Sequence, residues 1–108
     1  MTRVTIFKNE LNEYVGFKAD GHAGYDEEGQ DIVCAAISVL TINTINSLEA
    51  FTDEEFEVSS DQEEGCIECR VSDRPAKDAT LLLNAMVLGL EMIAENYENY
   101  IDLKFEEV

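Results

Sequence analysis

Histidine and basic residues are scarce in this chain of 108 residues. It contains one histidine, and seven lysine and arginine residues against 24 aspartate and glutamate residues. Any imidazole chemistry must therefore use His22. The net charge of −17 repels phosphate backbones, which disfavours direct binding of nucleic acid and favours a basic protein or peptide partner. Acidity that serves only solubility is the alternative.

Signatures of several large protein classes are also missing. The chain has no G-x-x-x-x-G-K-[ST], G-x-S-x-G or G-x-G-x-x-G motif and no D-x-[DN]-x-[DN]-G calcium loop. Arg3 and Lys8 flank only a short apolar stretch, unlike a signal peptide, and no run approaches the roughly 20 apolar residues of a spanning helix. Three cysteines, an odd number, make a poor disulfide framework. We expect a cytoplasmic protein with no membrane segment, metal or cofactor.

Apolar periodicity predicts a single domain over residues 1–108. Alternating positions predict five strands, over residues 2–9, 14–20, 56–60, 66–72 and 101–107. Helical spacing predicts two helices, over residues 31 to about 50 and 78–97. The order is ββαββαβ, and outward strand positions are mostly polar. This pattern favours an α+β two-layer sandwich, with a mainly antiparallel five-stranded sheet and both helices on one face.

The second predicted helix is apolar nearly all round. From Leu81 to Ala94 its only polar residues are Asn84 and Glu91. Such a helix must be covered on more than one side, and one sheet cannot do that. We therefore expect a homodimer formed through residues 81–94. A helix wedged inside one small domain is the alternative.

Cys66 and Cys69 have the C-x-x-C spacing that zinc and redox sites share. The predicted strand over residues 66–72 places the two thiols on opposite faces, because residues three apart in a strand point in opposite directions. We expect Cys69 in the core and Cys66 outside it, with no metal bound.

His22 and Cys34 supply an imidazole and a thiol twelve residues apart. Cys34 falls in the first turn of its predicted helix, where free N–H groups and the helix dipole stabilise a thiolate. The N–H groups around residues 33–35 are expected to hold an oxyanion. A contact between the two side chains would join a nucleophile to its base. The alternatives are a small buried cysteine and a histidine in a surface turn.

The stretch GHAGYDEEGQDIVCAAIS, residues 21–38, resembles the signature of the ribosomal-processing cysteine proteases, the Prp family. The resemblance covers nearly the whole chain in length and in the order of elements. It implies a cysteine endopeptidase that removes the N-terminal extension of a basic large-subunit ribosomal protein, the one numbered twenty-seven, through a thioester acyl-enzyme. His22 would be the base and Cys34 the nucleophile. The alternatives are a non-catalytic ribosome-assembly protein that holds a basic ribosomal tail, and a thiol hydrolase acting on a small ester.

Gly21, Asp31 and Ser38 match the family pattern as supporting residues. Asp31 is expected to cap the helix or to orient His22. Ser38 is expected to bond the carbonyl or thiol of Cys34, or simply its own helix. A glycine-punctuated acidic loop is expected to close over a basic peptide, and it contains Gly24, Asp26, Glu27, Glu28 and Gly29. A solvated charged loop is the alternative.

Overall fold

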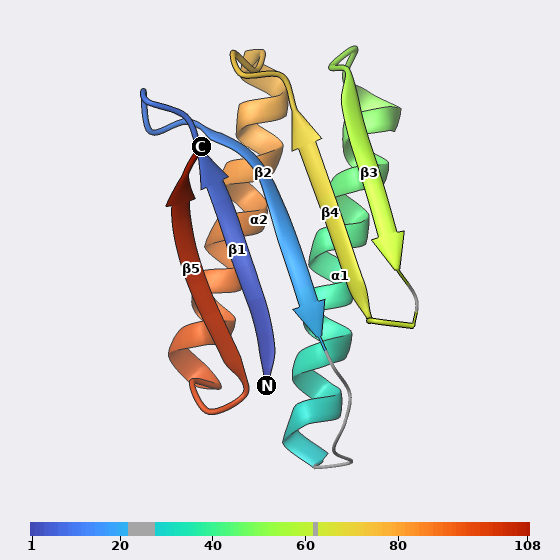
Figure 1. The fold of residues 1–108 in the computed structure, drawn as a ribbon, viewed down its shortest axis with the longest axis vertical. Coiled ribbons are helices and arrows are strands. Elements are labelled where there is room, and N and C mark those ends of the chain that lie inside the picture. The colour runs from blue at the N-terminus through green and yellow to red at the C-terminus, as the bar shows by residue number, and fades with distance from the viewer. Residues whose placement is uncertain (22–27, 62) are drawn as a thin grey trace.

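The computed structural model describes residues 1–21, 28–61 and 63–108, and only the backbone of residues 28–31. The strands are β1 (Thr2–Lys8), β2 (Tyr14–Gly21), β3 (Phe56–Asp61), β4 (Cys66–Val71) and β5 (Ile101–Glu107). The helices are α1 (Glu28–Phe51) and α2 (Lys77–Asn96). Figure 1 shows this ββαββαβ order, which confirms the predicted fold class.

The five strands form one sheet in the order β3-β4-β2-β1-β5. Three of the four pairings are antiparallel, and β1 pairs with β5 in parallel. The register places Thr2, at the start of β1, between Gly21 of β2 and Ile101 of β5. The beginning of β1 is therefore held on both sides by segments distant in the sequence.

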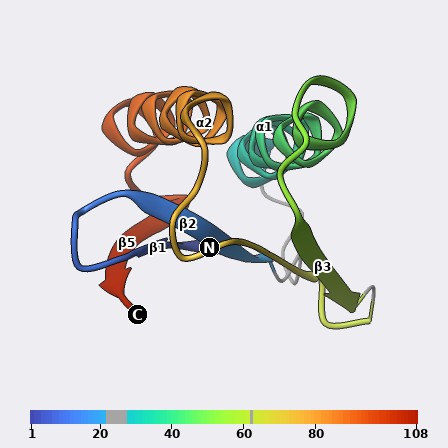
Figure 2. The same ribbon diagram turned by 90° about the horizontal axis from the view of Figure 1, so that it is seen from above.

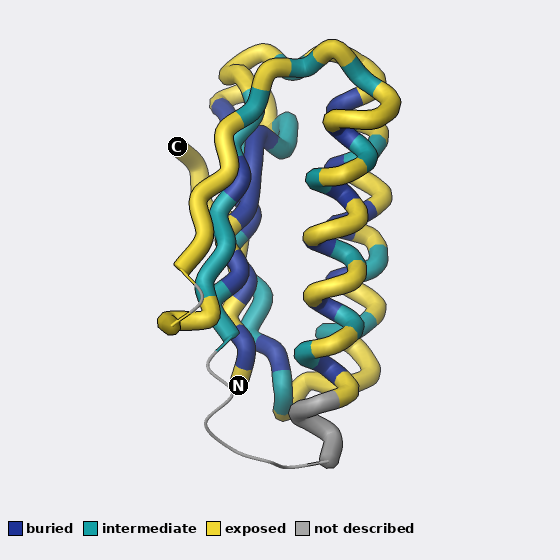
Figure 3. Tube along the Cα trace, turned by 90° about the vertical axis from the view of Figure 1, so that its right-hand side faces the viewer, coloured by how far each residue is buried: buried dark blue, intermediate teal, exposed yellow. Residues whose placement is uncertain are grey.

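Both helices cover the same face of the sheet (Figure 2). Alternate residues of the sheet and one stripe of each helix are buried between the layers (Figure 3), as the hydrophobic effect requires. The fully or almost fully buried residues include Val4, Ile6, Phe17, Val33, Ile37, Leu48, Cys69, Leu83, Met86, Val87 and Leu90. The predicted inward orientation of Cys69 is confirmed.

The helix α1 begins three residues earlier than predicted, at Glu28. Glutamate is a strong helix former, and acidic residues in a first turn interact favourably with the helix dipole. In the structure Glu28 and Gly29 belong to the helix and not to a loop. Asp31 lies inside the first turn, so the expectation that it caps the helix is wrong.

The expectation that no segment has the length and composition of a spanning helix is also wrong. Residues Ile32–Phe51 of α1 are long and apolar enough to cross a membrane by those two criteria. The same helix places Val33, Ile37 and Leu48 in the domain core, at 0–2% exposure. This is the arrangement of a core helix in a globular protein.

Candidate active site

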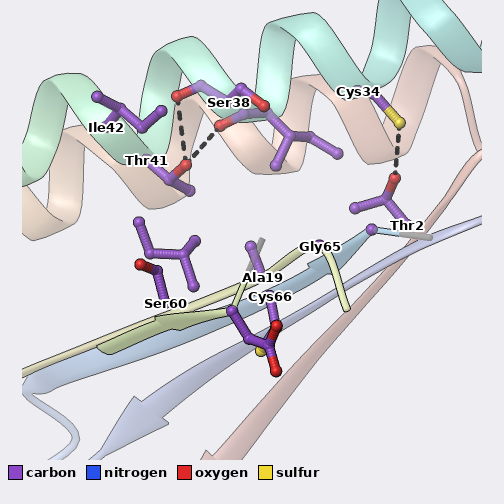
Figure 4. Close-up of a pocket in the computed structure, with 13 residues that line it drawn as sticks. Thr2, Ala19, Cys34, Ser38, Thr41, Ile42, Ser60, Gly65 and Cys66 are labelled. Atoms are coloured by element: carbon purple, nitrogen blue, oxygen red, sulfur yellow. Dashed lines mark hydrogen bonds between the residues drawn. The ribbon is translucent and has the colours of Figure 1, made fainter. Parts of the chain in front are cut away.

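Several elements meet around a cavity of about 340 Å³ between α1 and the sheet. The helix contributes Cys34, Ile37, Ser38, Thr41 and Ile42. The strands and their turns contribute Thr2, Ala19, Gly21, Ser60, Asp61, Gly65, Cys66 and Ile67. Figure 4 shows this space, with α1 on one side and the sheet on the other. The backbone of α1 stays farther from the strands than that of α2, which approaches β2 and β5, and this wider separation leaves room for the cavity.

Cys34 presents its thiol to this cavity. It is partly buried, and its Sγ lies 3.2 Å from Oγ1 of Thr2 (Figure 4). Cys34 is six residues beyond Glu28, in the second turn of α1 and not in the first. Only the first four N–H groups of a helix lack a partner within it. The expectation that the amides of residues 33–35 hold an oxyanion is therefore wrong, because those amides donate within the helix.

Ser38 and Thr41 extend the cavity wall along α1. Ser38 is exposed and lies one turn beyond Cys34, on the side that lines the cavity. Thr41 is buried, and its hydroxyl donates to the carbonyls of Ile37, at 2.8 Å, and of Ser38, at 3.3 Å (Figure 4). A threonine that bonds back to its own helix is satisfied without a partner from the sheet. Ser38 and Thr41 therefore form a polar wall of the cavity in which the Thr41 hydroxyl is already hydrogen-bonded.

Two glycines allow the β2 end and the β3–β4 turn to approach closely. The amide of Gly21 donates to the carbonyl of Gly65 at 3.0 Å. A Cβ on Gly65 would lie 2.5 Å from the carbonyl oxygen of Gly21, and Gly65 has a φ of +67°, a region that favours glycine. Gly21, which the sequence predicts to be a supporting residue, therefore lies against Gly65 at the border of the cavity.

The thiols of Cys66 and Cys69 both have raised pKa values. Burial raises the pKa of Cys69 to about 11. The pKa of Cys66 is also raised, chiefly by burial, with Asp20, Glu68 and Asp61 adding to the shift and Lys18 opposing it. A thiol reacts as its thiolate, so each of these residues has a smaller reactive fraction near pH 7 than an ordinary cysteine. Cys66 is partly exposed and lines the cavity, whereas Cys69 is fully buried.

Several predicted positions lie outside the described residues. They are His22, Gly24, Asp26 and Glu27. Of Glu28, Gly29 and Asp31 the structure describes the backbone, which is helical. Gly21, the residue before His22, lines the cavity that contains Cys34.

Sequence reasoning missed Thr2 and Gly65. Thr2 shares its strand face with the buried residues Val4 and Ile6. A polar residue at such an inward position is the sequence feature that could have marked it as a site residue. Gly65 ends the acidic turn between β3 and β4, where a glycine commonly supplies a positive φ.

Comparison with known proteins identifies the family. A family model described as cysteine protease Prp matches residues 1–102. The chain belongs to the Prp family of cysteine proteases. A ribosomal processing cysteine protease Prp from Staphylococcus aureus is 31% identical over 106 residues, which cover 98% of this chain and 100% of that protein.

Solved structures of Prp agree in fold. The S. aureus essential ribosomal processing protease Prp in complex with a substrate peptide superposes with a TM-score of 0.91 at 30% identity, covering 97% of this chain and 99% of that one. The same protease with a covalently linked product peptide gives a TM-score of 0.86 at 31% identity, with the same coverage. As a Prp family member, this chain is a cysteine protease.

Proposed function

We propose that this Prp family member removes the N-terminal extension of a basic large-subunit ribosomal protein, the one numbered twenty-seven, with Cys34 as nucleophile and His22 as base. The observation that carries the proposal is the position of the Cys34 thiol, which opens on a cavity at the end of β2, directly before His22 in the sequence. The names of the S. aureus relatives support a ribosomal substrate and a covalent step. We place the reaction in the cytoplasm, where thiols stay reduced.

The chemistry is acyl transfer to sulfur. His22 takes the proton of the Cys34 thiol, and the sulfur attacks the scissile carbonyl carbon. The tetrahedral intermediate collapses to a thioester, and the leaving amine takes the proton from His22. Water then attacks the thioester with His22 again as base, which releases the acid product and restores the thiol. Each proton removed is returned, so the dyad ends each turnover unchanged.

The cavity walls favour a large apolar side chain next to the scissile bond. Ile37 and Ile42 of α1 face Ala19 and Ile67 of the sheet across this space. An apolar side chain that leaves water for such walls gains roughly 25 cal/mol per Å² of buried apolar area. The enzyme would then select its substrate by burying one apolar side chain in the cavity and by attracting charged residues of the substrate outside it.

The attraction of a basic substrate is assigned to the acidic residues before Cys34. Asp26, Glu27 and Glu28 lie between His22 and the body of α1 in the sequence. We propose that they attract the basic residues of the substrate, an interaction that salt screens. Replacing all three with their amides should raise KM at low salt and leave kcat unchanged. An unchanged KM under those conditions would remove this part of the proposal.

The apolar outer face of the helices supports a homodimer through residues 81–94. On α2, Leu81, Leu88 and Met92 are 68%, 64% and 58% exposed. Met92 also lines an apolar groove of about 550 Å³ between the helices, together with Val39 and Gly89. Exposed apolar patches of this kind mark interaction sites. Light scattering at micromolar concentration should give twice the mass of the chain, and Leu88→Glu should halve it. A wild-type monomer would contradict the dimer.

The decisive test of the proteolytic function is cleavage of an N-terminally extended ribosomal protein, followed by intact mass. Wild type should release one N-terminal peptide, and Cys34→Ala should release none. Cys66→Ala is the matched control, because Cys66 lines the same cavity and should be dispensable. A Cys34→Ala variant that cleaves at the wild-type rate refutes the proposal. Stable binding of the extension without cleavage would favour the non-catalytic assembly role instead.

A further inference from the structure

Thr2 is the residue of β1 that touches the Cys34 thiol. Its side chain is only 3% exposed, and its Oγ1 lies 3.2 Å from Sγ of Cys34. In Figure 4 the two side chains point toward each other, one from the sheet and one from α1. The contact joins residues 32 positions apart in the sequence. It is therefore a product of the tertiary fold and not of local helix geometry.

The backbone of Thr2 is held on both sides by neighbouring strands. Its backbone amide donates to the carbonyl of Tyr100 at 3.0 Å, and the strand is paired on both sides, with Gly21 and with Ile101. A Cβ on Gly21 would lie 3.3 Å from Cγ2 and 3.4 Å from Oγ1 of Thr2. The absence of a side chain at Gly21 therefore leaves the space that the Thr2 side chain occupies.

We propose that Thr2 is a positioning residue, whose hydroxyl donates a hydrogen bond to the Cys34 thiolate and holds the sulfur at the mouth of the cavity. The inference rests on the proposed role of Cys34 as nucleophile. A neutral thiol can donate to Oγ1, but an ionised sulfur can only accept. When His22 takes the proton, the Thr2 hydroxyl rotates about its C–O bond and becomes the donor. No covalent bond of Thr2 breaks or forms.

The position of Cys34 in α1 explains why such a donor is useful. The helix dipole acts within the first turn, and Cys34 lies in the second. Hydrogen bonds to charged groups are stronger than those between neutral groups. The Thr2 hydroxyl thus supplies at the sulfur part of the stabilisation that a first-turn position would have supplied.

Two substitutions isolate the hydroxyl. Thr2→Val removes it at nearly constant shape, and Thr2→Ser keeps it. Thr5→Val is the matched control, because Thr5 is on the same strand but on the opposite face from Thr2. Among the described residues that line the cavity, Asp61 and Cys66 are the other ionisable groups, and none of these variants changes them.

The first measurement is the rate of Cys34 alkylation by iodoacetamide as a function of pH, read by peptide mass spectrometry. Thr2→Val should move the midpoint of the profile about one unit to higher pH. Thr2→Ser and Thr5→Val should keep the wild-type midpoint. This readout needs no peptide substrate, so it tests the Thr2 contact even if Cys34→Ala still cleaves and the proposed function fails.

The second measurement is cleavage. Thr2→Val should lower kcat about tenfold with KM within about twofold, and Thr2→Ser should restore most of kcat. If Thr2→Val does not fold, as judged by circular dichroism, Thr2→Ala carries the same test without a β-branched side chain. A hydroxyl-free variant that folds and keeps the wild-type alkylation profile overturns the inference, whatever its kcat.

Discussion

The two ββα halves of the domain differ at equivalent points of their helices. Cys34 lies six residues beyond the start of α1, and Leu83 lies six residues beyond the start of α2. Leu83 is fully buried, whereas Cys34 is partly exposed beside a cavity. The backbone of α2 lies close to β2 and β5, and that of α1 stays farther from the strands. The same supersecondary unit thus makes a closed core in one half and an open site in the other.

The polarity of the buried stripes explains this difference. The inward face of α2 presents Ala79, Leu83, Met86, Val87 and Leu90, all apolar. The inward face of α1 includes Thr41 and Thr44, whose hydroxyls donate to Ile37 and Leu40 of their own helix. A threonine whose hydroxyl already donates to a carbonyl of its own helix gains little from contact with an apolar sheet. A less apolar helix face therefore tolerates the gap in which a substrate side chain is expected to bind.

The largest expected effect is the loss of cleavage in Cys34→Ala, which should come with little change in stability. Cys34→Ala should lower cleavage at least about a thousandfold, because the nucleophile is lost. It should change the free energy of unfolding by less than about 1 kcal/mol, since the side chain borders a cavity. Intact mass and urea unfolding measure the two quantities. A large loss of stability would mean that this half of the domain is packed as tightly as the other.

The opposite outcome is expected at Leu83. Leu83→Ala should destabilise the fold by about 2–5 kcal/mol, because it leaves a void in a close-packed core. Cleavage per folded molecule should stay near the wild-type value. Asn84→Ala, at an exposed neighbouring position of α2, is the control and should change stability by less than about 0.5 kcal/mol. Equal effects of the two substitutions would argue against a closed core in this half.

Alkaline pH tests the burial of the Cys69 thiol in the closed core. The pKa of Cys69 is about 11 in the fold against an ordinary value of 9.0, because burial disfavours the thiolate. Above pH 9 the Cys69 thiol ionises in the unfolded chain but stays protonated in the fold. The free energy of unfolding should therefore be unaffected below pH 9 and fall by roughly 2 kcal/mol as pH rises toward 11. Urea unfolding between pH 8 and 11 measures the loss. Cys69→Ala should weaken this dependence.

The last effect, similar in size to that at Cys69, concerns the turn that closes the cavity. Gly65→Ala should destabilise the fold by about 1–3 kcal/mol, because alanine meets both the positive φ and the Gly21 carbonyl oxygen. It should also lower cleavage, since Gly21 borders the cavity. Gly89→Ala on α2 is the comparison, because its Cβ would meet only the flexible side chain of Leu40. Thermal unfolding should show Gly89→Ala to be near neutral, given the helix propensity of alanine.

The sequence allowed the fold to be predicted well because each element depends on local periodicity. The alternation around Cys69 placed it in the core, and the apolar pattern of α2 defined that helix to within about a residue at each end. The start of α1 was missed, because Glu28 and Gly29 resemble loop residues and Asp31 resembles a cap. Local patterns do not separate an acidic loop from an acidic first turn.

The site was predictable only in part. Cys34 could be selected from its neighbours in the sequence, and its position beside a cavity is consistent with that selection. The contact with Thr2 depends on the pairing of β1 with β2 and β5 and on the distance of α1 from the sheet. Contacts between distant segments of the chain produce no periodic pattern in the sequence from which they could be predicted. The role of His22 stays a prediction.

The parallel pairing of β1 with β5 has a consequence for biosynthesis. Thr2 emerges from the ribosome early, but Tyr100 and Ile101, which fix its backbone, are made about a hundred residues later. A nascent chain cannot complete this wall of the cavity until the later strand has been released and has docked.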